Sequence, residues 1–183
     1  MTCRLRNLCE DDLERVRQWR MAPEVTRHMY TDPEITPEQQ QAWFERISRS
    51  SRDRVWVIDT VPDHQPVGVL SLSDIDVDHR RCSWAYYLGS EAARGRGLAK
   101  VLELNIYRYV FEVLALNSLW CEVLAENNRV VKLHERFGSK VEGILRQHVR
   151  KNGTTHDVVR MAVLASDWPQ IRDAFTFTTI EIE

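Results

Sequence analysis

Two apolar strand patterns separated by one long helix pattern constrain the fold more than any other feature of the chain. Residues 82–89, CSWAYYLG, and residues 118–125, SLWCEVLA, have the aromatic and apolar content of β-strands. Between them, residues 97–116 repeat apolar side chains every three or four positions, which predicts a helix with one buried face. A strand, a helix and a strand in this order predict a layered fold in which the helix covers one face of a sheet.

The remaining patterns add strands and helices before and after this unit. Further strands are predicted at residues 4–8, 54–60 and 66–75, and as a hairpin within 141–165 that turns at Asn152-Gly153. Helix starts are predicted at Asp11 or Asp12, at the capping box of residues 36–39, at Asn127 or Asn128, and at Ser166. The order predicts an α/β (α+β) fold with a mixed central sheet of about seven strands flanked by helices.

Length and composition fit one domain, predicted over residues 1–175 and followed by a fraying tail at 176–183. The 183 residues are 43% hydrophobic and 28% charged, with a net charge of -2, so we expect no nucleic-acid partner. The four cysteines form no C-x-x-C pair, and three lie in or beside apolar runs that predict buried, reduced thiols. The N-terminus has no apolar signal segment and no run is long enough to span a membrane, so we expect a cytoplasmic protein.

The residues Arg94-Gly95-Arg96-Gly97 stand at the junction of strand 82–89 and the long helix. Glycines let backbone N–H groups turn toward a ligand, and a helix N-terminus attracts anions. A Walker loop would need Gly-Lys-Ser/Thr, and a dinucleotide fingerprint would need a glycine where Lys100 stands. The junction therefore predicts a phosphate-binding loop of another kind, or else a solvated charged turn.

Residues 94–99, RGRGLA, match the pattern Arg/Gln-x-x-Gly-x-Gly/Ala and resemble the acetyl-CoA pyrophosphate loop of the GNAT N-acetyltransferase superfamily. The resemblance implies the GNAT acyl-CoA acyltransferase fold, acetyl-CoA as cosubstrate and no metal. It also implies a set of residues that bind the cosubstrate: Tyr87, Leu88, Gly89, Arg94, Gly95, Arg96, Gly97, Leu98, Ala99, Asn127 and Lys132.

Two later blocks extend the resemblance over nearly the whole chain. Residues 126–138, ENNRVVKLHERFG, resemble the family motif Asn-x-x-Ala-x-x-Leu-Tyr-x-x-x-Gly-Phe, with Val130 at the alanine position and His134 at the tyrosine position. Ser139 replaces the final phenylalanine. Residues 149–168 resemble the closing hairpin of the branch that contains ribosomal-protein, spermidine and nucleotide-sugar acetyltransferases.

The resemblance implies direct attack of an amine on the thioester, with two proton-transfer residues. Glu122, a carboxylate in an apolar strand, is the candidate base, acting through water; a structural ion pair or an exposed edge position is the alternative. His134 is the candidate acid, since imidazole has an unperturbed pKa of about 6.5; packing, or a hydrogen bond to CoA, is the alternative. A backbone N–H between Tyr87 and Gly89 is the candidate oxyanion donor.

The acceptor is predicted from residues 17–30, RQWRMAPEVTRHMY, which together with KLHERFG resemble the UDP-4-amino-sugar acetyltransferases of pseudaminic acid biosynthesis. Arg20 would pair with the UDP pyrophosphate, and Met29, Tyr30, Phe44 and Tyr87 would form a wall for uracil. Core packing and a solvated helix face are the alternatives for these residues.

The predicted partner is therefore a small UDP-amino sugar, bound by a monomer or homodimer without nucleic acid or membrane. A ribosomal-protein-type N-terminal alanine acetyltransferase is the second hypothesis. A non-catalytic CoA-binding module is the third, and Glu122 together with an apolar entry to the thioester favours an enzyme over that module.

Overall fold

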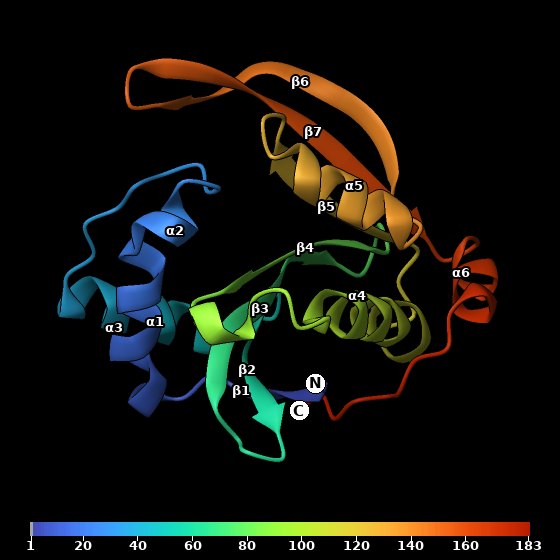
Figure 1. The fold of residues 1–183 in the computed structure, drawn as a ribbon, viewed down its shortest axis with the longest axis horizontal. Helices are drawn as coiled ribbons and strands as arrows, with labels where there is room; N and C mark the ends of the chain where they lie inside the picture. The colour runs from blue at the N-terminus through green and yellow to red at the C-terminus, as the bar shows by residue number, and fades with distance from the viewer. Residues whose placement is uncertain (1) are drawn as a thin grey trace.

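The computed structural model describes residues 2–183 and contains a seven-stranded mixed sheet with helices on both faces (Figure 1). The strand order is β1-β2-β3-β4-β5-β7-β6, and only β4 and β5 are parallel neighbours. The strands are β1 (Thr2–Asn7), β2 (Arg54–Val61), β3 (Pro66–Asp76), β4 (Arg81–Leu88), β5 (Ser118–Leu124), β6 (Lys140–Lys151) and β7 (Thr154–Leu164). The predicted mixed sheet of about seven strands is confirmed.

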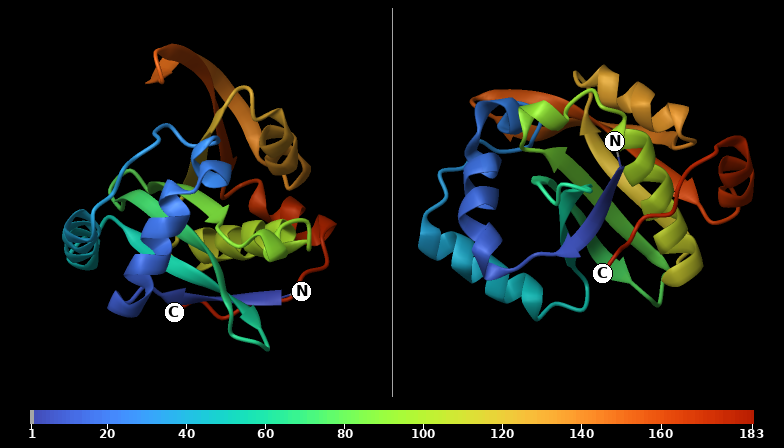
Figure 2. Two further views of the ribbon diagram at one scale, coloured as in Figure 1. Left: turned by 60° about the vertical axis from the view of Figure 1, so that its left-hand side comes forward. Right: turned by 60° about the horizontal axis from the view of Figure 1, so that its bottom comes forward.

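Two groups of helices cover the two faces of the sheet (Figure 2). The first group comes from the N-terminal part of the chain: α1 (Leu13–Met21), α2 (Pro23–Thr26) and α3 (Pro37–Ser48). The second group lies on the opposite face: α4 (Leu98–Arg108), α5 (Asn128–Arg136) and α6 (Trp168–Ala174). Two single-turn 3-10 helices, Glu10–Asp12 and Glu91–Ala93, lead into α1 and toward α4.

Two local sequence signals produce the structures they predict. The Thr36 hydroxyl accepts from the Gln39 N–H at 3.2 Å, and the Gln39 side chain accepts from the Thr36 N–H at 2.9 Å, which forms the capping box that begins α3. Asn152 and Gly153 both have positive φ, 49° and 79°, as a two-residue turn between β6 and β7 requires.

Helix α4 is buried on nearly all sides rather than on one stripe, and it ends differently from the prediction. Its last part, Tyr109–Val113, is a π-helix in which the Leu114 N–H bonds to the Tyr109 carbonyl at 2.9 Å. The wider turn keeps Tyr109 against Trp56, where its hydroxyl accepts from Arg54 at 2.7 Å. Val113, within the predicted helix 97–116, is 56% exposed.

The C-terminal residues pack against the domain, so the expectation that residues 176–183 fray is wrong. Ile182 pairs with Leu5 beside β1, and Ile180 is buried. The Asn105 side chain, fully buried on α4, donates to the Thr178 carbonyl at 3.0 Å and accepts from the Ile180 N–H at 3.0 Å. The right-hand view of Figure 2 shows this segment, in red, running alongside α4. A buried amide on α4 needs these partners, and the tail supplies them.

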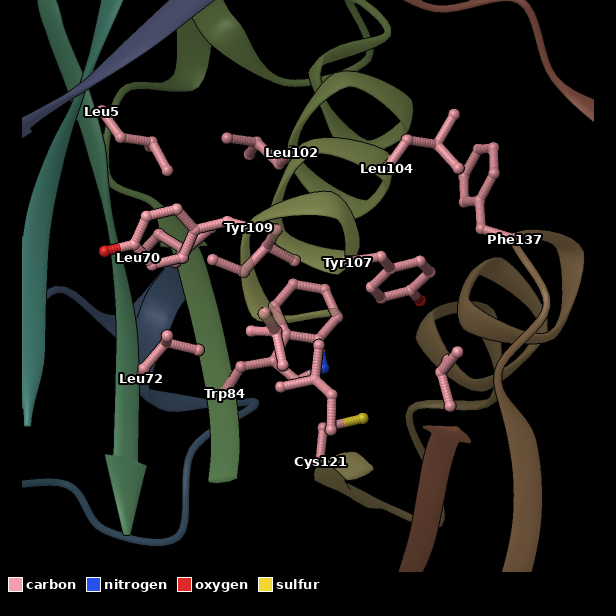
Figure 3. Close-up of a cluster of buried hydrophobic side chains, with 14 of the residues drawn as sticks. Leu5, Leu70, Leu72, Trp84, Leu102, Leu104, Tyr107, Tyr109, Cys121 and Phe137 are labelled. Carbon is pink, nitrogen blue, oxygen red and sulfur yellow. The ribbon is translucent and has the colours of Figure 1, made fainter. Parts of the chain in front are cut away.

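Strands β4 and β5 are paired over only three residues each, and this short pairing creates the site. Their register covers Arg81–Ser83 of β4 and Ser118–Trp120 of β5. Beyond Ser83 the two strands have no ladder with each other. Figure 3 shows the adjoining core, where Trp84 of β4 lies beside Tyr107 of α4.

Candidate active site

A cavity of about 290 Å³ lies where β4 and β5 separate. Residues 84–88 of β4 line one side and residues 121–123 of β5 line the other. The α2 region and the ends of the glycine loop and α5 complete it: Glu24, Val25, His28, Met29, Arg94, Asn127, Val130 and His134.

The cavity passes through the sheet from one face to the other. Neighbouring residues of a strand point to opposite faces, and both Cys121 and Glu122 line it. Cys121 belongs to the core beneath α4 and α5, whereas Glu122 contacts Tyr30, which follows α2. A molecule entering from the α2 side can therefore meet one entering from the α4 and α5 side.

The predicted glycine loop lies between β4 and α4. Gly95 and Gly97 have φ values of 74° and 82°, in the left-handed region, and Gly97 is the N-cap of α4 without a side-chain cap bond. A Cβ at either glycine would meet no atom within 4 Å, so backbone conformation rather than space requires glycine here. The first N–H groups of α4 have no helical partner and are available to an anion.

The residues predicted to hold the cosubstrate are spread over the cavity and its surroundings. Tyr87, Leu88, Arg94 and Asn127 line the cavity. The Arg94 guanidinium donates to the Leu88 carbonyl at 3.1 Å, which ties the loop to the end of β4. The other predicted residues do not line it: Gly89, Gly95, Arg96, Gly97, Leu98, Ala99 and Lys132.

Two of those residues have surroundings of their own. Gly89 contacts the Trp19 indole, since a Cβ there would lie 2.2 Å from the ring. Lys132 is exposed on α5. Their roles toward the cosubstrate remain predictions.

Glu122 lies in a network of side chains on the α2 face. Its Oε1 accepts from the Arg160 guanidinium at 2.6 and 3.0 Å, and its Oε2 accepts from the Tyr30 hydroxyl at 2.7 Å. Arg160 also lies 3.7 Å from the Trp120 ring centroid. The ion-pair alternative is therefore present. The role of Glu122 as a base remains a prediction.

His134 lies on the opposite face, buried at 5% exposure between α5, β4 and α4. Its ring contacts Trp84, with centroids 5.4 Å apart, and its Nδ1 is 3.2 Å from Oε2 of Glu103. That distance is within ion-pair range, whereas the direction falls outside that of a well-formed hydrogen bond. The ring also lines the cavity, and its role as an acid remains a prediction.

The residues predicted to bind the acceptor do not line one common cavity, which is a correction to the predicted uracil wall. Met29 lines the cavity between β4 and β5, and the hydroxyl of Tyr30 bonds to Glu122. Phe44 lines a separate cavity beside Trp56, because α3 packs at the far edge of the sheet. Arg20 donates to the Thr31 hydroxyl at 2.9 Å in a neighbouring cavity that shares Tyr87.

Sequence reasoning missed three polar residues of the site. Glu103 is a carboxylate within the buried face of α4, four residues before Tyr107, and that position in an apolar helix was the available signal. Glu24 and His28 line the α2 side of the cavity, and in the sequence they look like residues of an ordinary exposed helix surface.

The cysteines are free, and three of them, Cys3, Cys82 and Cys121, are buried as predicted. Cys121 lines the cavity, and burial raises the pKa of its thiol to about 12. A thiol with that pKa is protonated near neutral pH and is a poor nucleophile.

Within residues 2–183, no group of three or more His, Cys, Asp or Glu side chains is arranged to hold a metal ion. Over the same residues, the helices are all too short or too polar to cross a membrane.

Comparison with known proteins gives a consistent family. An acetyltransferase (GNAT) domain matches residues 3–140. The chain is 24% identical to spermidine N(1)-acetyltransferase of Vibrio cholerae over 164 residues, which cover 90% of this chain and 94% of the relative. It is 23% identical to acetyltransferase PseH of Campylobacter jejuni over 136 residues, which cover 73% and 82% of the two chains.

The fold has a close structural counterpart as well. The structure of spermidine N-acetyltransferase from Vibrio cholerae in complex with CoA and spermine superimposes with a TM-score of 0.86 at 23% identity, covering 91% of this chain and 98% of that one. The predicted closer resemblance to amino-sugar acetyltransferases is not confirmed, because spermidine acetyltransferases match over more of the chain. Since the family domain spans more than half of the sequence, the chain belongs to the GNAT acetyltransferase family and is an acetyl-CoA-dependent N-acetyltransferase.

Proposed function

We propose that the protein transfers the acetyl group of acetyl-CoA directly to a primary amine of a small cationic molecule of the polyamine class. The cavity through the sheet carries this proposal, because it joins the glycine-loop side to the α2 side at the point where β4 and β5 separate. Holding the amine and the thioester in line there supplies much of the rate enhancement.

Acetyl-CoA is assigned to the side of the glycine loop and α4. The left-handed Gly95 and Gly97 turn the backbone at the start of α4, where free N–H groups and the helix dipole attract pyrophosphate. Arg94 adds a positive charge beside Leu88. The protein from Vibrio cholerae with the same fold binds CoA, which supports this assignment.

Direct transfer is favoured over a covalent acyl-enzyme. Cys121 is the cavity's only thiol among residues 2–183, and the pKa of about 12 that burial gives it keeps it protonated. The amine therefore attacks the thioester carbon itself. His134, on the cosubstrate face, is the residue we assign to protonate the leaving thiolate.

The acceptor side suits a positively charged amine. Glu24 and Glu122 both line the cavity there, and Glu122 is held in place by Arg160 and Tyr30. Arg160 holds the Glu122 carboxylate at the cavity, and we assign to this carboxylate first the attraction of the ammonium group and then the passage of its proton to water. The spermidine acetyltransferase of Vibrio cholerae, similar to this chain in sequence and in fold, supports an acceptor of this class.

A nucleotide-linked amino sugar is the second candidate, because one observation favours it. Tyr87 separates the through-sheet cavity from a neighbouring cavity of about 590 Å³ that contains Arg20 and Trp43. An amino sugar in the first cavity would leave its nucleotide near the guanidinium and indole of the second. The similarity to acetyltransferase PseH supports this candidate.

Release of free thiol from acetyl-CoA tests the proposal against a panel of acceptors: spermidine, spermine, a UDP-4-amino sugar and a peptide with an N-terminal alanine. We expect turnover with the polyamines, and a raised polyamine KM in Glu24→Gln with an unchanged acetyl-CoA KM. Glu45→Gln, at an exposed position on α3 that lines neither the through-sheet cavity nor its neighbour, is the matched control. Turnover of the UDP-amino sugar alone would move the assignment to the second candidate, and turnover of the peptide alone would make the protein an N-terminal acetyltransferase.

A further inference from the structure

A buried carboxyl group on α4 has neither solvent contact nor a well-formed hydrogen bond from a basic side chain. Glu103 is a carboxyl group on α4 with 0% exposure. The Tyr107 hydroxyl donates to its Oε2 at 3.0 Å, and His134 Nδ1 is 3.2 Å from the same oxygen. Its Oε1 has no hydrogen-bond partner within the described residues.

A carboxylate in this position is not needed for packing. Burying an ion costs several kcal/mol unless it is well paired, and an apolar side chain of similar volume is often at least as stable. Leu102 and Leu104 on either side are fully buried, so an apolar residue fits the pattern of the helix. The group that Glu103 faces across the α4–α5 contact is the ring of His134.

The side chains that face Glu103 include one base, the imidazole of His134. The titratable groups that face Glu103 are Tyr107 on α4, Tyr86 on β4, Cys121 on β5 and His134 on α5. The first three are neutral acids, and burial together with Glu103 raises the pKa values of Tyr86 and Tyr107. Arg160 acts on Cys121 from the other face of the sheet, where Glu122 pairs with it.

We propose that Glu103 is a positioning residue for acetyl transfer. Its carboxylate accepts a hydrogen bond from Nδ1–H of His134, so that Nε2 is the ring nitrogen that donates a proton in the cavity. This inference rests on the proposed role of His134. The two ring nitrogens lie on different edges of the imidazole. A hydrogen bond donated by one nitrogen fixes the proton there, and the other nitrogen can then gain and lose a proton. The present angle at Nδ1 is poor, and such bonds commonly tighten when substrate binds.

The step balances as follows. The acceptor nitrogen forms a bond to the acetyl carbon, and the carbon–sulfur bond breaks with its electron pair on sulfur. Nε2–H of the imidazolium gives its proton to the thiolate, while the proton of the amine leaves on the Glu122 side. His134 is then neutral with its proton on Nδ1, bonded to Glu103, and it regains a proton at Nε2 from water.

Nitrogen-15 NMR of the folded protein, alone and with CoA, tests the proposal without knowledge of the acceptor. The His134 signals are identified by their loss in His134→Phe. At alkaline pH we expect neutral His134 to carry its proton on Nδ1 in the wild type and in Glu103→Gln, whose amide oxygen still accepts. Glu103→Leu removes the acceptor and should move the proton to Nε2. Glu112→Gln alters a carboxylate that bonds Trp168 at the far end of the helix and should change nothing.

Steady-state kinetics, measured with the acceptor that the enzyme acetylates, test the effect of Glu103 on the reaction. Glu103→Leu should lower kcat about 10- to 100-fold, less than the ~10⁴ that a triad carboxylate contributes, with the acetyl-CoA KM changed less than about twofold. A wild-type His134 protonated on Nε2 would overturn the proposal even if Glu103→Leu does not fold. If kcat is unchanged in Glu103→Leu but lowered in His134→Phe, the positioning role of Glu103 is overturned while the acid role of His134 stands. Unchanged kcat in His134→Phe would overturn the acid role and with it the part of Glu103.

Discussion

Deletion of residues 178–183 should destabilise the protein, although these residues lie far from the site in sequence. The deletion exposes the surroundings of Ile180, a burial that contributes about 1.5–3 kcal/mol. It also removes the Glu183 carbonyl, which accepts from Trp56 Nε1 at 2.7 Å, a bond worth about 1 kcal/mol. Asn105 loses two of its three partners, at about another 1 kcal/mol because water reaches part of the opened site.

These contributions add to about 4 kcal/mol, a large fraction of the ~5–15 kcal/mol by which domains are stable. Urea unfolding measures the change, and with an m-value of about 2 kcal/mol/M the midpoint should fall by about 2 M. Ile180→Ala alone should account for about half of the loss, and Glu181→Ala, at an exposed position, should stay within about 0.5 kcal/mol of the wild type. A deletion that costs less than about 1 kcal/mol would refute the packed tail.

Three further predictions concern the site. Gly97→Asp should abolish the rise in Tm that CoA produces, because it places a negative charge beside the pyrophosphate. Gly97→Ala should only add about 1–2 kcal/mol of backbone strain at φ 82° and should keep part of the rise. Equal CoA-induced Tm shifts in both variants and the wild type would contradict the assignment of the loop to pyrophosphate. His134→Phe should lower kcat about 10²–10³-fold at an unchanged acetyl-CoA KM, and His134→Tyr should recover much of the rate and extend the alkaline limb, since an unperturbed phenol is protonated to about pH 10; wild-type kcat in His134→Phe would make the ring a packing residue. Iodoacetamide at pH 8 should add one label per chain, at exposed Cys9, as measured by mass spectrometry. Buried Cys3, Cys82 and Cys121 should stay unlabelled, because their raised pKa of about 12 keeps them as thiols. Rapid labelling of Cys121 would contradict its protonated state.

The sequence by itself determined the elements and the family. Local signals decide such features, because a capping box, a two-residue turn and an apolar period act within a few residues of the chain. The capping box at Thr36 and the Asn152-Gly153 turn are both present as the sequence predicts.

The tertiary structure alone decided which side chains meet. Phe44 and Met29 were predicted to contact the same uracil ring. They line different cavities, because α3 places Phe44 beside β2 and away from the gap between β4 and β5. Glu122 and Arg160 are 38 residues apart and became partners only through the register of β5 with β7. A sequence pattern contains no record of such register or of where two strands separate.

The same limit applies to the ends of the chain and to the buried polar residues. The tail reads as a polar segment, and its order comes from Asn105 and β1, which lie more than 70 residues away in sequence. In the sequence, Glu103 looks like one charged residue on an amphipathic helix; in the fold, α5 places His134 beside it. Hydrogen-bond partners of buried polar groups are set by packing over long sequence separations, so only the folded structure identifies Glu103 as the neighbour of His134.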